Sequence, residues 1–260
     1  MTNFKLNFKL MIVVVILAVF SAGSIISAFA AEKYLLEFKY KMGDKIKYNI
    51  IMNGVTKMET AAKKGDAKVD VKMNVEQNIL YVNQKNGNID LQTKILSGVA
   101  KNAEGKDEDL TNIGNTVYMT INKSGELLGA TSYDANYDPI SISMSFPKEA
   151  VPVGHTWKTE IKQPIPMVLT YKLKEVKKHK NHNCAVIEQL ITVSPEVKNV
   201  NAKGTGLIYF DLDKGYVVTN ESKTDITMNQ ELENDMPSLG AAKKKVKTIV
   251  DLSTKMELSE

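Results

Sequence analysis

Three side chains that could bind a metal ion lie close together in the sequence. His179, His182 and Cys184 fall within KHKNHNC, and imidazole with thiolate is a ligand set that suits zinc. Their His-x2-His-x-Cys spacing matches no standard zinc pattern, and the lysines interleaved with them repel a cation. A polar hairpin followed by a strand with a buried cysteine explains the same residues. We therefore expect no metal site here.

The sequence offers no clear catalytic constellation. Nucleophilic catalysis needs Ser, Cys or Thr beside a histidine and an orienting acid, but there is no Gly-x-Ser-x-Gly elbow, and the three histidines fall near predicted turns. No carboxylate pair stands out for glycoside chemistry, and no glycine-rich loop opens a helix to hold phosphates. DLDKG at residues 211–215 resembles the opening of a calcium loop but lacks the rest of that loop. We expect no enzymatic activity and no cofactor.

The segment VPVGHTWKTEI, residues 151–161, contains the single tryptophan of the chain together with a histidine. In one interpretation, Pro152 and Gly154 form a turn, after which Trp157 packs against one end of a β core. In the other, Trp157 and His155 line the mouth of a ligand pocket. The packing interpretation has the stronger physical basis, because lone tryptophans that are buried are usually packing residues.

Tyr133-Asp134 and Tyr137-Asp138 repeat four residues apart within residues 131–147. Pairs of an aromatic and an acidic side chain can bind sugars or peptides, and loops often carry function, which makes Tyr133 and Tyr137 candidate ligand-binding residues. The same spacing suits one turn of helix that covers the end of a barrel as a lid.

Strands are the elements that must position these residues. Apolar and polar side chains alternate along residues 46–52, 69–75 and 246–258, the pattern of strands with one buried face; Ile249 alone breaks the last alternation. No long segment has the pattern of an amphipathic helix. Residues 101–112 and 231–245 are predicted as polar linkers, the second with room for a helical turn. Hairpin turns are predicted at Asn86-Gly87, residues 122–125, residues 177–183 and residues 213–215.

Together these patterns predict an all-β protein, or a mainly β protein with a short helix. The expected architecture is a long, curved antiparallel sheet that forms a half-barrel, a barrel or a sandwich. GDKIKYNI and GHTWKTEI share Gly, Lys and Ile at the same offsets, and TVYMTINKSGELLG resembles GLIYFDLDKGYVV. These pairs indicate two degenerate repeats, residues 31–146 and 147–260, within one continuous domain. Chance similarity between antiparallel strands is the alternative.

The first thirty residues have the pattern of a signal peptide. Lys5 and Lys9 precede an apolar run at residues 10–20, and Ala28-Phe29-Ala30 provides a cleavage site. Cleavage after Ala30 would leave no stable transmembrane segment and would export the protein to the periplasm or the extracellular space. An uncleaved membrane anchor at residues 10–31 is the alternative.

The composition excludes several kinds of partner. Lys and Arg together number 34 against 30 acidic residues, so the charge is nearly balanced and gives no reason to expect a nucleic-acid partner. Arginine is absent from the sequence, and with it the bidentate recognition of phosphate or carboxylate. Cys184 is the single cysteine, so no internal disulfide forms and stability must come from an apolar core.

The order of these features resembles that of a set of uncharacterised secreted bacterial proteins. The resemblance lies in the signal peptide, YKMGDKIKYNI at residues 40–50, FPKEAVPVGHTWK at residues 146–158 and the alternating final strand. Those proteins carry a Val-x-Val-Gly-Asp-x-Trp-like motif, from which this chain departs with Pro152 before Val153 and His155 in place of the acid. Long antiparallel strands without disulfides also look like the half-barrel carriers of the bacterial envelope, which hold acyl chains in an apolar concavity.

Two hypotheses of different class follow. The first is an envelope carrier that binds an apolar small molecule or a lipid, with flexible methionine side chains forming the walls of its cavity. The second is a structural or interaction module with a filled core, which would bind an envelope protein through its surface or edge strands. The methionines expected to line such a cavity include Met42, Met52, Met58, Met73, Met119, Met144 and Met167.

Overall fold

The structure, a computed structural model, describes residues 32–60, 64–102, 105–111, 113–132, 144–161, 166–232 and 244–259. Residues 33–260 form one compact unit. The predicted signal peptide lies outside the described residues, so its cleavage stays a prediction.

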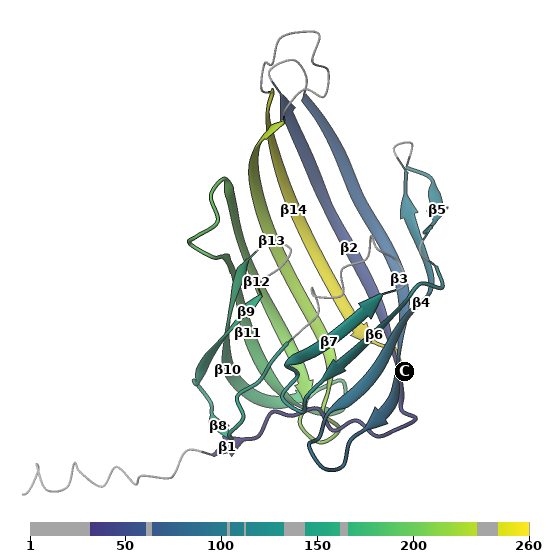
Figure 1. The fold of residues 1–260 in the computed structure, drawn as a ribbon, viewed down its shortest axis with the longest axis vertical. Coiled ribbons are helices and arrows are strands. Elements are labelled where there is room, and N and C mark those ends of the chain that lie inside the picture. The colour runs from purple at the N-terminus through teal and green to yellow at the C-terminus, as the bar shows by residue number, and fades with distance from the viewer. Residues whose placement is uncertain are drawn as a thin grey trace, which may run out of the picture. The chain divides into compact units, whose positions relative to one another are not determined.

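Every regular element of the described residues is a β-strand, which confirms the predicted all-β class (Figure 1). The strands are β1 (Lys33–Tyr34), β2 (Lys45–Thr60), β3 (Lys64–Val82), β4 (Ile89–Lys101), β5 (Asp107–Asp109), β6 (Thr116–Ile121), β7 (Leu127–Ser132), β8 (Val151–Pro152), β9 (Thr156–Ile161), β10 (Met167–His179), β11 (His182–Val193), β12 (Val200–Asp211), β13 (Tyr216–Leu232) and β14 (Lys244–Leu258).

Twelve of these strands form one antiparallel sheet in the order β7-β6-β4-β3-β2-β14-β13-β12-β11-β10-β9, with β5 beside β4. From β2 to β4 and from β9 to β14, neighbours in the sequence are neighbours in the sheet, and β14 pairs with β2 to join these two runs of strands. Strands β7 and β9 are the two ends of this order, and they do not pair with each other within the described residues. The sheet is therefore open, which corresponds to the half-barrel among the expected architectures. Strands β1 and β8 form a separate two-stranded sheet.

The sheet curls around its core. Met119 on β6 and Leu169 on β10, near opposite edges of the sheet, belong to one cluster of buried apolar side chains. We call the face that carries this cluster the inner face. Because side chains alternate between the faces of a strand, the register of the strands assigns every other residue to the inner face. The strands predicted at residues 46–52, 69–75 and 246–258 are confirmed as parts of β2, β3 and β14.

Residues 35–44 cross one end of the sheet, and we call this segment the strap. Its side chains alternate as those of a strand do, so that Leu36, Phe38 and Tyr40 are buried in the core. Phe38 N–H donates to Lys123 O at 2.8 Å, which ties the strap to the β6–β7 turn. Gly215, in the β12–β13 turn, has φ +68°, and a Cβ there would overlap the strap backbone. The strap therefore closes the lower end of the core in Figure 1.

Aromatic rings from three separate segments meet beneath the strap. The ring of Phe210, on β12, is fully buried and lies edge-on to Phe38 and to Phe146, with centroids 5.5 and 4.6 Å away. Phe146 belongs to the connection that leads from β7 to β9, and its N–H donates to Ser124 O at 2.7 Å. This aromatic cluster joins the strap, the connection and the sheet into one core.

The two segments that the sequence aligns as repeats make the same hydrogen bonds. Gly43 N–H donates to Ile79 O at 2.8 Å, and Ile79 N–H donates back to the residue after the glycine at 2.9 Å. In the same way, Gly154 N–H donates to Leu173 O at 2.7 Å, and Leu173 N–H donates to His155 O, on the residue after the glycine, at 3.0 Å. Register shifts begin at Ile79 in β3 and at Leu173 in β10. The two segments thus have the same local hydrogen bonds, although β2 lies in the middle of the sheet and β9 at its edge. A duplication of the two halves stays a prediction.

Each of the four predicted hairpin turns joins two antiparallel strands. Gly87, Gly125 and Gly215 have positive φ in three of them, and Lys180 and Asn181 do so in the fourth. The linker predicted at residues 101–112 is wrong in part, since it contains the short strand β5, which folds back on β4. The helical turn predicted within residues 231–245 lies mostly outside the described residues.

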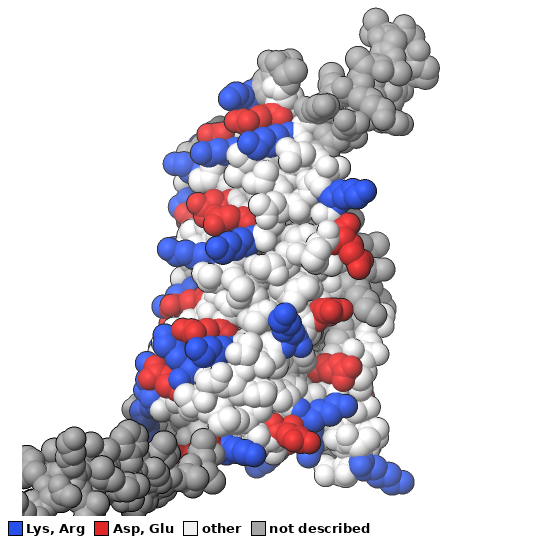
Figure 2. Space-filling model, turned by 90° about the vertical axis from the view of Figure 1, so that its left-hand side faces the viewer, with Lys and Arg blue, Asp and Glu red and all other residues white. Residues whose placement is uncertain are grey.

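Charged side chains gather on the outer face of the sheet. Figure 2 shows lysines and acidic residues in alternating bands over one face of the molecule, separated by surface without charge. Cross-strand pairs of opposite charge occur on the outer face, such as Lys174 with Glu188 at 2.9 Å and Lys47 with Glu76 at 3.8 Å. Such exposed pairs add little stability, so the fold depends mainly on the apolar inner face.

Candidate functional site

Trp157 lies on β9 and packs inward. Its ring stacks on Tyr171 of β10 with centroids 5.4 Å apart, and lies 6.5 Å from Phe146. Its indole N–H donates to Ser145 O at 2.8 Å, so the polar end of the ring has a partner. These contacts favour the packing interpretation of Trp157.

His155 is exposed, and its ring lies 6.4 Å from that of Trp157 in a stacked orientation. The structure thus brings two of the four candidate ligand-binding residues together. The other two, Tyr133 and Tyr137, lie outside the described residues, as does most of the lid predicted over residues 131–147. A ligand site built from these four residues stays a prediction.

The structure gives the three possible metal ligands separate partners. His179 Nε2 lies 3.0 Å from Thr219 Oγ1, whereas His182 Nδ1 lies 2.6 Å from Asp211 Oδ2. Cys184 is fully buried, and burial, aided by nearby carboxylates, raises the pKa of its thiol to about 12. The described part of the chain contains no group of His, Cys, Asp and Glu side chains arranged to hold a metal ion.

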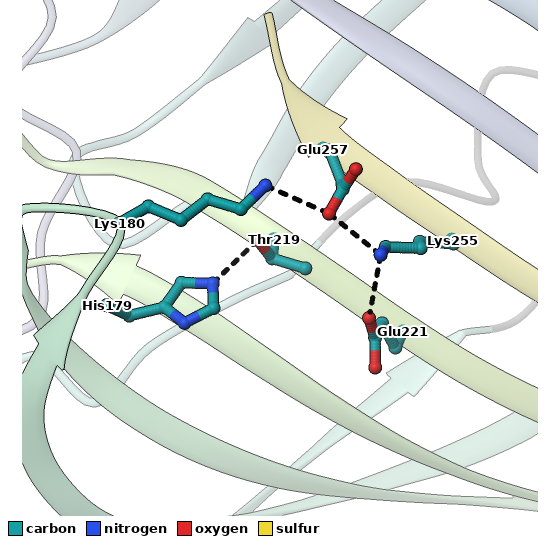
Figure 3. A network of polar contacts seen from close by, with 6 residues as sticks. All are labelled: His179, Lys180, Thr219, Glu221, Lys255 and Glu257. Atoms are coloured by element: carbon teal, nitrogen blue, oxygen red, sulfur yellow. Dashed lines mark hydrogen bonds and ion pairs between the residues drawn. The ribbon is translucent and has the colours of Figure 1, made fainter.

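A chain of polar contacts joins the β10–β11 hairpin to β13 and β14 (Figure 3). Glu257 Oε1 lies 2.9 Å from Lys180 Nζ and 2.8 Å from Lys255 Nζ, and Lys255 also reaches Glu221 at 3.4 Å. Hydrogen bonds from Lys255 and Lys180 lower the pKa of Glu257. These side chains bind one another, which indicates a role in holding strands together on the outer face.

His179 should make stability depend on pH. Burial, with the charge of Lys180, lowers the pKa of His179 below its usual 6.5. The unfolded chain therefore binds this proton first, and the free energy of unfolding should fall as the pH drops from 6.5 toward the folded pKa. His179→Gln should remove this decrease in stability, measured as the melting temperature across that pH range. His155→Gln, at an exposed histidine, should keep the decrease. A decrease of the same size in both variants would contradict this assignment.

Asp211 organises the β12–β13 turn. Its carboxylate is 2 % exposed, and Oδ1 accepts the N–H groups of Asp213 and Lys214 at 2.7 and 2.9 Å. Burial alone would raise the pKa of Asp211, but hydrogen bonds from Lys214, His182 and Asp213 lower it by more. The ionised form is therefore the one that stabilises the fold, and this stabilisation is lost as the pH falls through the folded pKa.

Replacing Asp211 with alanine should destabilise the protein by about 2–4 kcal/mol, because two backbone N–H groups and the His182 ring lose a buried acceptor. Asp213→Ala, at the exposed neighbouring position, should cost less than about 0.5 kcal/mol. Urea unfolding near neutral pH measures both. Equal losses in the two variants would show that Asp211 does not hold the turn.

The inner face away from the strap is uncharged and only half-buried. It continues the buried face marked by Tyr48 and Val75 along the rest of the central strands, where the same alternation places no Lys, Asp or Glu at residues 48–60, 65–75 and 246–258. The half-buried residues on this face of β2, β3 and β14 include Ile50, Met52, Gly54, Thr56, Thr60, Val69, Val71, Met73, Val246, Thr248, Val250, Leu252, Thr254, Met256 and Leu258.

Some of the methionines expected to line a cavity lie on this face, and others do not. Met52, Met73 and Met167 are half-buried on the inner face, as expected for the wall of a cavity. Met119 is packed in the core, whereas Met42, on the strap, is 69 % exposed. The expectation that Met42 lines a cavity is therefore wrong, because the strap turns this side chain outward.

A shallow, open hollow of about 400 Å³ lies across β12, β13 and β14. Six of its nine lining residues, among them Leu207, Glu221 and Lys255, belong to the outer face by the alternation of the strands. The other three, Gly206, Ser222 and Thr254, lie between them on the same strands, so the hollow lies mainly on the outer face.

Apart from Met167, the inner-face residues of β10 to β14 were not among the candidates from the sequence, because they come from different strands and no spacing connects them. The available signal was the alternation itself, which lists the inner residues of each strand. No protein-family model matches the chain, and no curated protein is similar to it in sequence. The described residues include no helix that is long and apolar enough to span a membrane.

Proposed function

We propose that this protein is an exported, non-enzymatic envelope protein that binds an apolar, lipid-like ligand on the inner face of its open sheet. The observation that carries the proposal is the half-buried inner face of β2, β3, β13 and β14, which carries no charged side chain among those described, whereas the described charged side chains of these four strands lie on the opposite face. Burying such a face against hydrocarbon is favourable in proportion to the apolar area removed from water.

The length of the face suits an acyl chain. From Ile50 to Met58 along β2, the rise of an extended strand gives about 26 Å. One acyl chain spans about half of the ~30 Å hydrocarbon core of a bilayer, so a whole chain fits along the strands. Met52, Met58 and Met73 would provide walls that adapt to different chains.

Export is supported by the signal-peptide pattern of residues 1–30 alone. In the proposed role, the mature protein would begin at Ala31 and act outside the cytoplasmic membrane. The intact mass of protein recovered from its native host tests this point, and a mass that still includes residues 1–30 would favour the anchored alternative.

Organic extraction of protein purified from its native envelope, followed by mass spectrometry, tests the binding role. An apolar compound should appear at about one molecule per chain. Denatured protein from the same preparation, washed before extraction, is the control for adherent membrane lipid. Equal recovery from native and denatured protein, or no compound at all, would count against the proposal.

A structural or interaction module is the second candidate, and the edge strand β7 favours it. Its sequence, LLGATS, has no charge, Leu128 is 49 % exposed, and within the described residues β7 pairs with β6 alone. Uncharged exposed edges accept added strands, whereas the other edge, β9, carries Lys158 and Glu160. Co-purification of one envelope protein in a fixed ratio, lost on replacing Gly129 with proline, would favour this role.

A further inference from the structure

Hydroxyl and amide side chains form a line across the mainly apolar inner face. Tyr171 on β10 pairs with Gln189 on β11, and Gln189 with Gly206 on β12. Gly206 in turn pairs with Ser222 on β13, and Ser222 with Thr254 on β14. We call Tyr171, Gln189, Ser222 and Thr254 the polar row. Gln189 Nε2 donates to Tyr171 Oη at 3.3 Å, so one end of the row is hydrogen-bonded internally.

Side chains of this row lie close to Gly206, which has no side chain of its own. A Cβ built on Gly206 would lie 2.9 Å from Gln189 Oε1 and 3.4 Å from Ser222 Cβ. At Gly204, one row further along, a Cβ would lie 2.8 Å from Thr224 Oγ1. The amide of Gln189 and the hydroxyl of Thr224 therefore cover the two glycines of β12, so that polar atoms of the neighbouring strands line the inner face at these positions.

An unsatisfied acceptor adjoins the row. Asn220 precedes Ser222 by two residues on β13, so both side chains lie on the inner face, and Asn220 pairs with Ile208 and Met256. Within the described residues, Asn220 Oδ1 is buried and has no hydrogen-bond partner. A buried carbonyl oxygen without a donor is unfavourable, so this position calls for a donor that the chain itself does not supply.

The neighbouring rows of the inner face are mainly apolar and contain no charged side chain. The row toward the strap contains Leu173, Ile187 and Ile208, and the row beyond Gly204 contains Ile226 and Val250. Lys178 lies on the inner-face register of β10, but only at the hairpin end of that strand. From the row of Leu173 and Ile187 away from the strap, no lysine or acidic residue occupies the inner face of β10 to β14 among the residues whose side chains are described. A carboxylate or phosphate placed there would lose its hydration without gaining a counter-charge.

From this placement we infer that the polar row and Asn220 recognise a neutral hydrogen-bonding group, a hydroxyl above all, on a single-chain amphiphile whose hydrocarbon lies along the apolar rows. The ligand class is that of a long-chain alcohol or a monoacylglycerol, rather than a free fatty acid or a phospholipid. The inference rests on the proposed function, since it specifies the ligand of the same face.

Competition for the neutral fluorophore N-phenyl-1-naphthylamine tests the ligand class. The probe is first bound to the full chain and then displaced by dodecanol, monododecanoylglycerol or dodecanoate, at about pH 8, where a free carboxylate is ionised. The two neutral ligands should displace the probe at concentrations about ten-fold lower than dodecanoate, because the site offers hydrogen bonds and no cation. Dodecanoate competing as well as the alcohol would overturn the inference.

Isosteric substitutions test the residues. Ser222→Ala with Thr254→Val should weaken displacement by monododecanoylglycerol about ten-fold, with the affinity for the fluorophore measured separately in each variant and used to correct the comparison. The matched control is Thr205→Val with Ser253→Ala, which removes the same hydroxyls from the outer face. Asn220→Leu is an independent variant that should act in the same direction.

Failure of the inference and failure of the proposed function give different results. If the fluorophore binds saturably but the inner and outer double variants behave alike, the polar row has no role in recognition, while the binding face remains. If the fluorophore does not bind the unmodified chain, the proposed function fails and the inference falls with it.

Discussion

Phe210→Ala should destabilise the protein by about 3–5 kcal/mol. The side chain is fully buried, and its ring contacts Phe38 of the strap and Phe146 of the β7–β9 connection. Truncation therefore leaves a cavity where three segments distant in sequence meet, and the strap loses part of its anchor. Urea unfolding followed by the fluorescence of Trp157, whose ring lies 6.5 Å from Phe146, measures the loss.

Phe210→Leu is the matched control, because it keeps an apolar side chain of nearly sufficient volume. It should cost no more than about 1.5 kcal/mol. If alanine and leucine at this position were equivalent, or if Phe210→Ala lost less than about 1 kcal/mol, the aromatic cluster could not be the junction that we describe.

Val250→Glu should weaken binding of N-phenyl-1-naphthylamine at least about ten-fold, since a carboxylate on the ligand-binding face must lose its hydration when the ligand covers it. Val250 is half-buried on the inner face of β14, between Ile226 and Thr56. Fluorescence titration of the full chain, with melting temperatures recorded for each variant, measures the effect.

Ile249→Glu is the control at the neighbouring position. Ile249 is also half-buried, but it faces outward between Thr227 and Lys57, so the same charge should leave binding within about two-fold. Val250→Thr, which keeps the shape of valine, gives a milder inner-face change should the glutamate variant not fold. Loss of binding in Ile249→Glu alone would place the ligand on the outer face.

The alternation of the sequence predicted the strands well, because alternation is a local consequence of burying one face of a sheet. Residues 246–258 illustrate this, since β14 places the predicted apolar side inward and Ile249 outward. Hairpins were predictable for the same reason, as Gly125 and Gly215 mark turns with positive φ. Pairing between distant strands has no comparable local signal. The contact of β14 with β2, and the path of the strap, depend on how the whole sheet closes on its core.

The candidate site was less predictable than the fold. Trp157 was a candidate because it is the single tryptophan of the sequence, but its contacts with Tyr171 and Ser145 are those of a packing residue. The polar row was not predicted, because its members come from separate strands and are common residue types. A sequence signal did exist: Gln189 interrupts the inner-face series between Ile187 and Ile191. Recognising it as part of a row requires the register of the strands.

The central claim is that hydrocarbon binds to the inner face of the sheet. Photo-crosslinking of the full chain with an alkyl diazirine, followed by digestion and mass spectrometry, tests it most directly. The account predicts labels on inner-face residues such as Met52, Val250 and Leu252, reduced by excess dodecanol. Labels that concentrate on outward residues such as Ile51 and Ile249, or that excess dodecanol does not reduce, would contradict it.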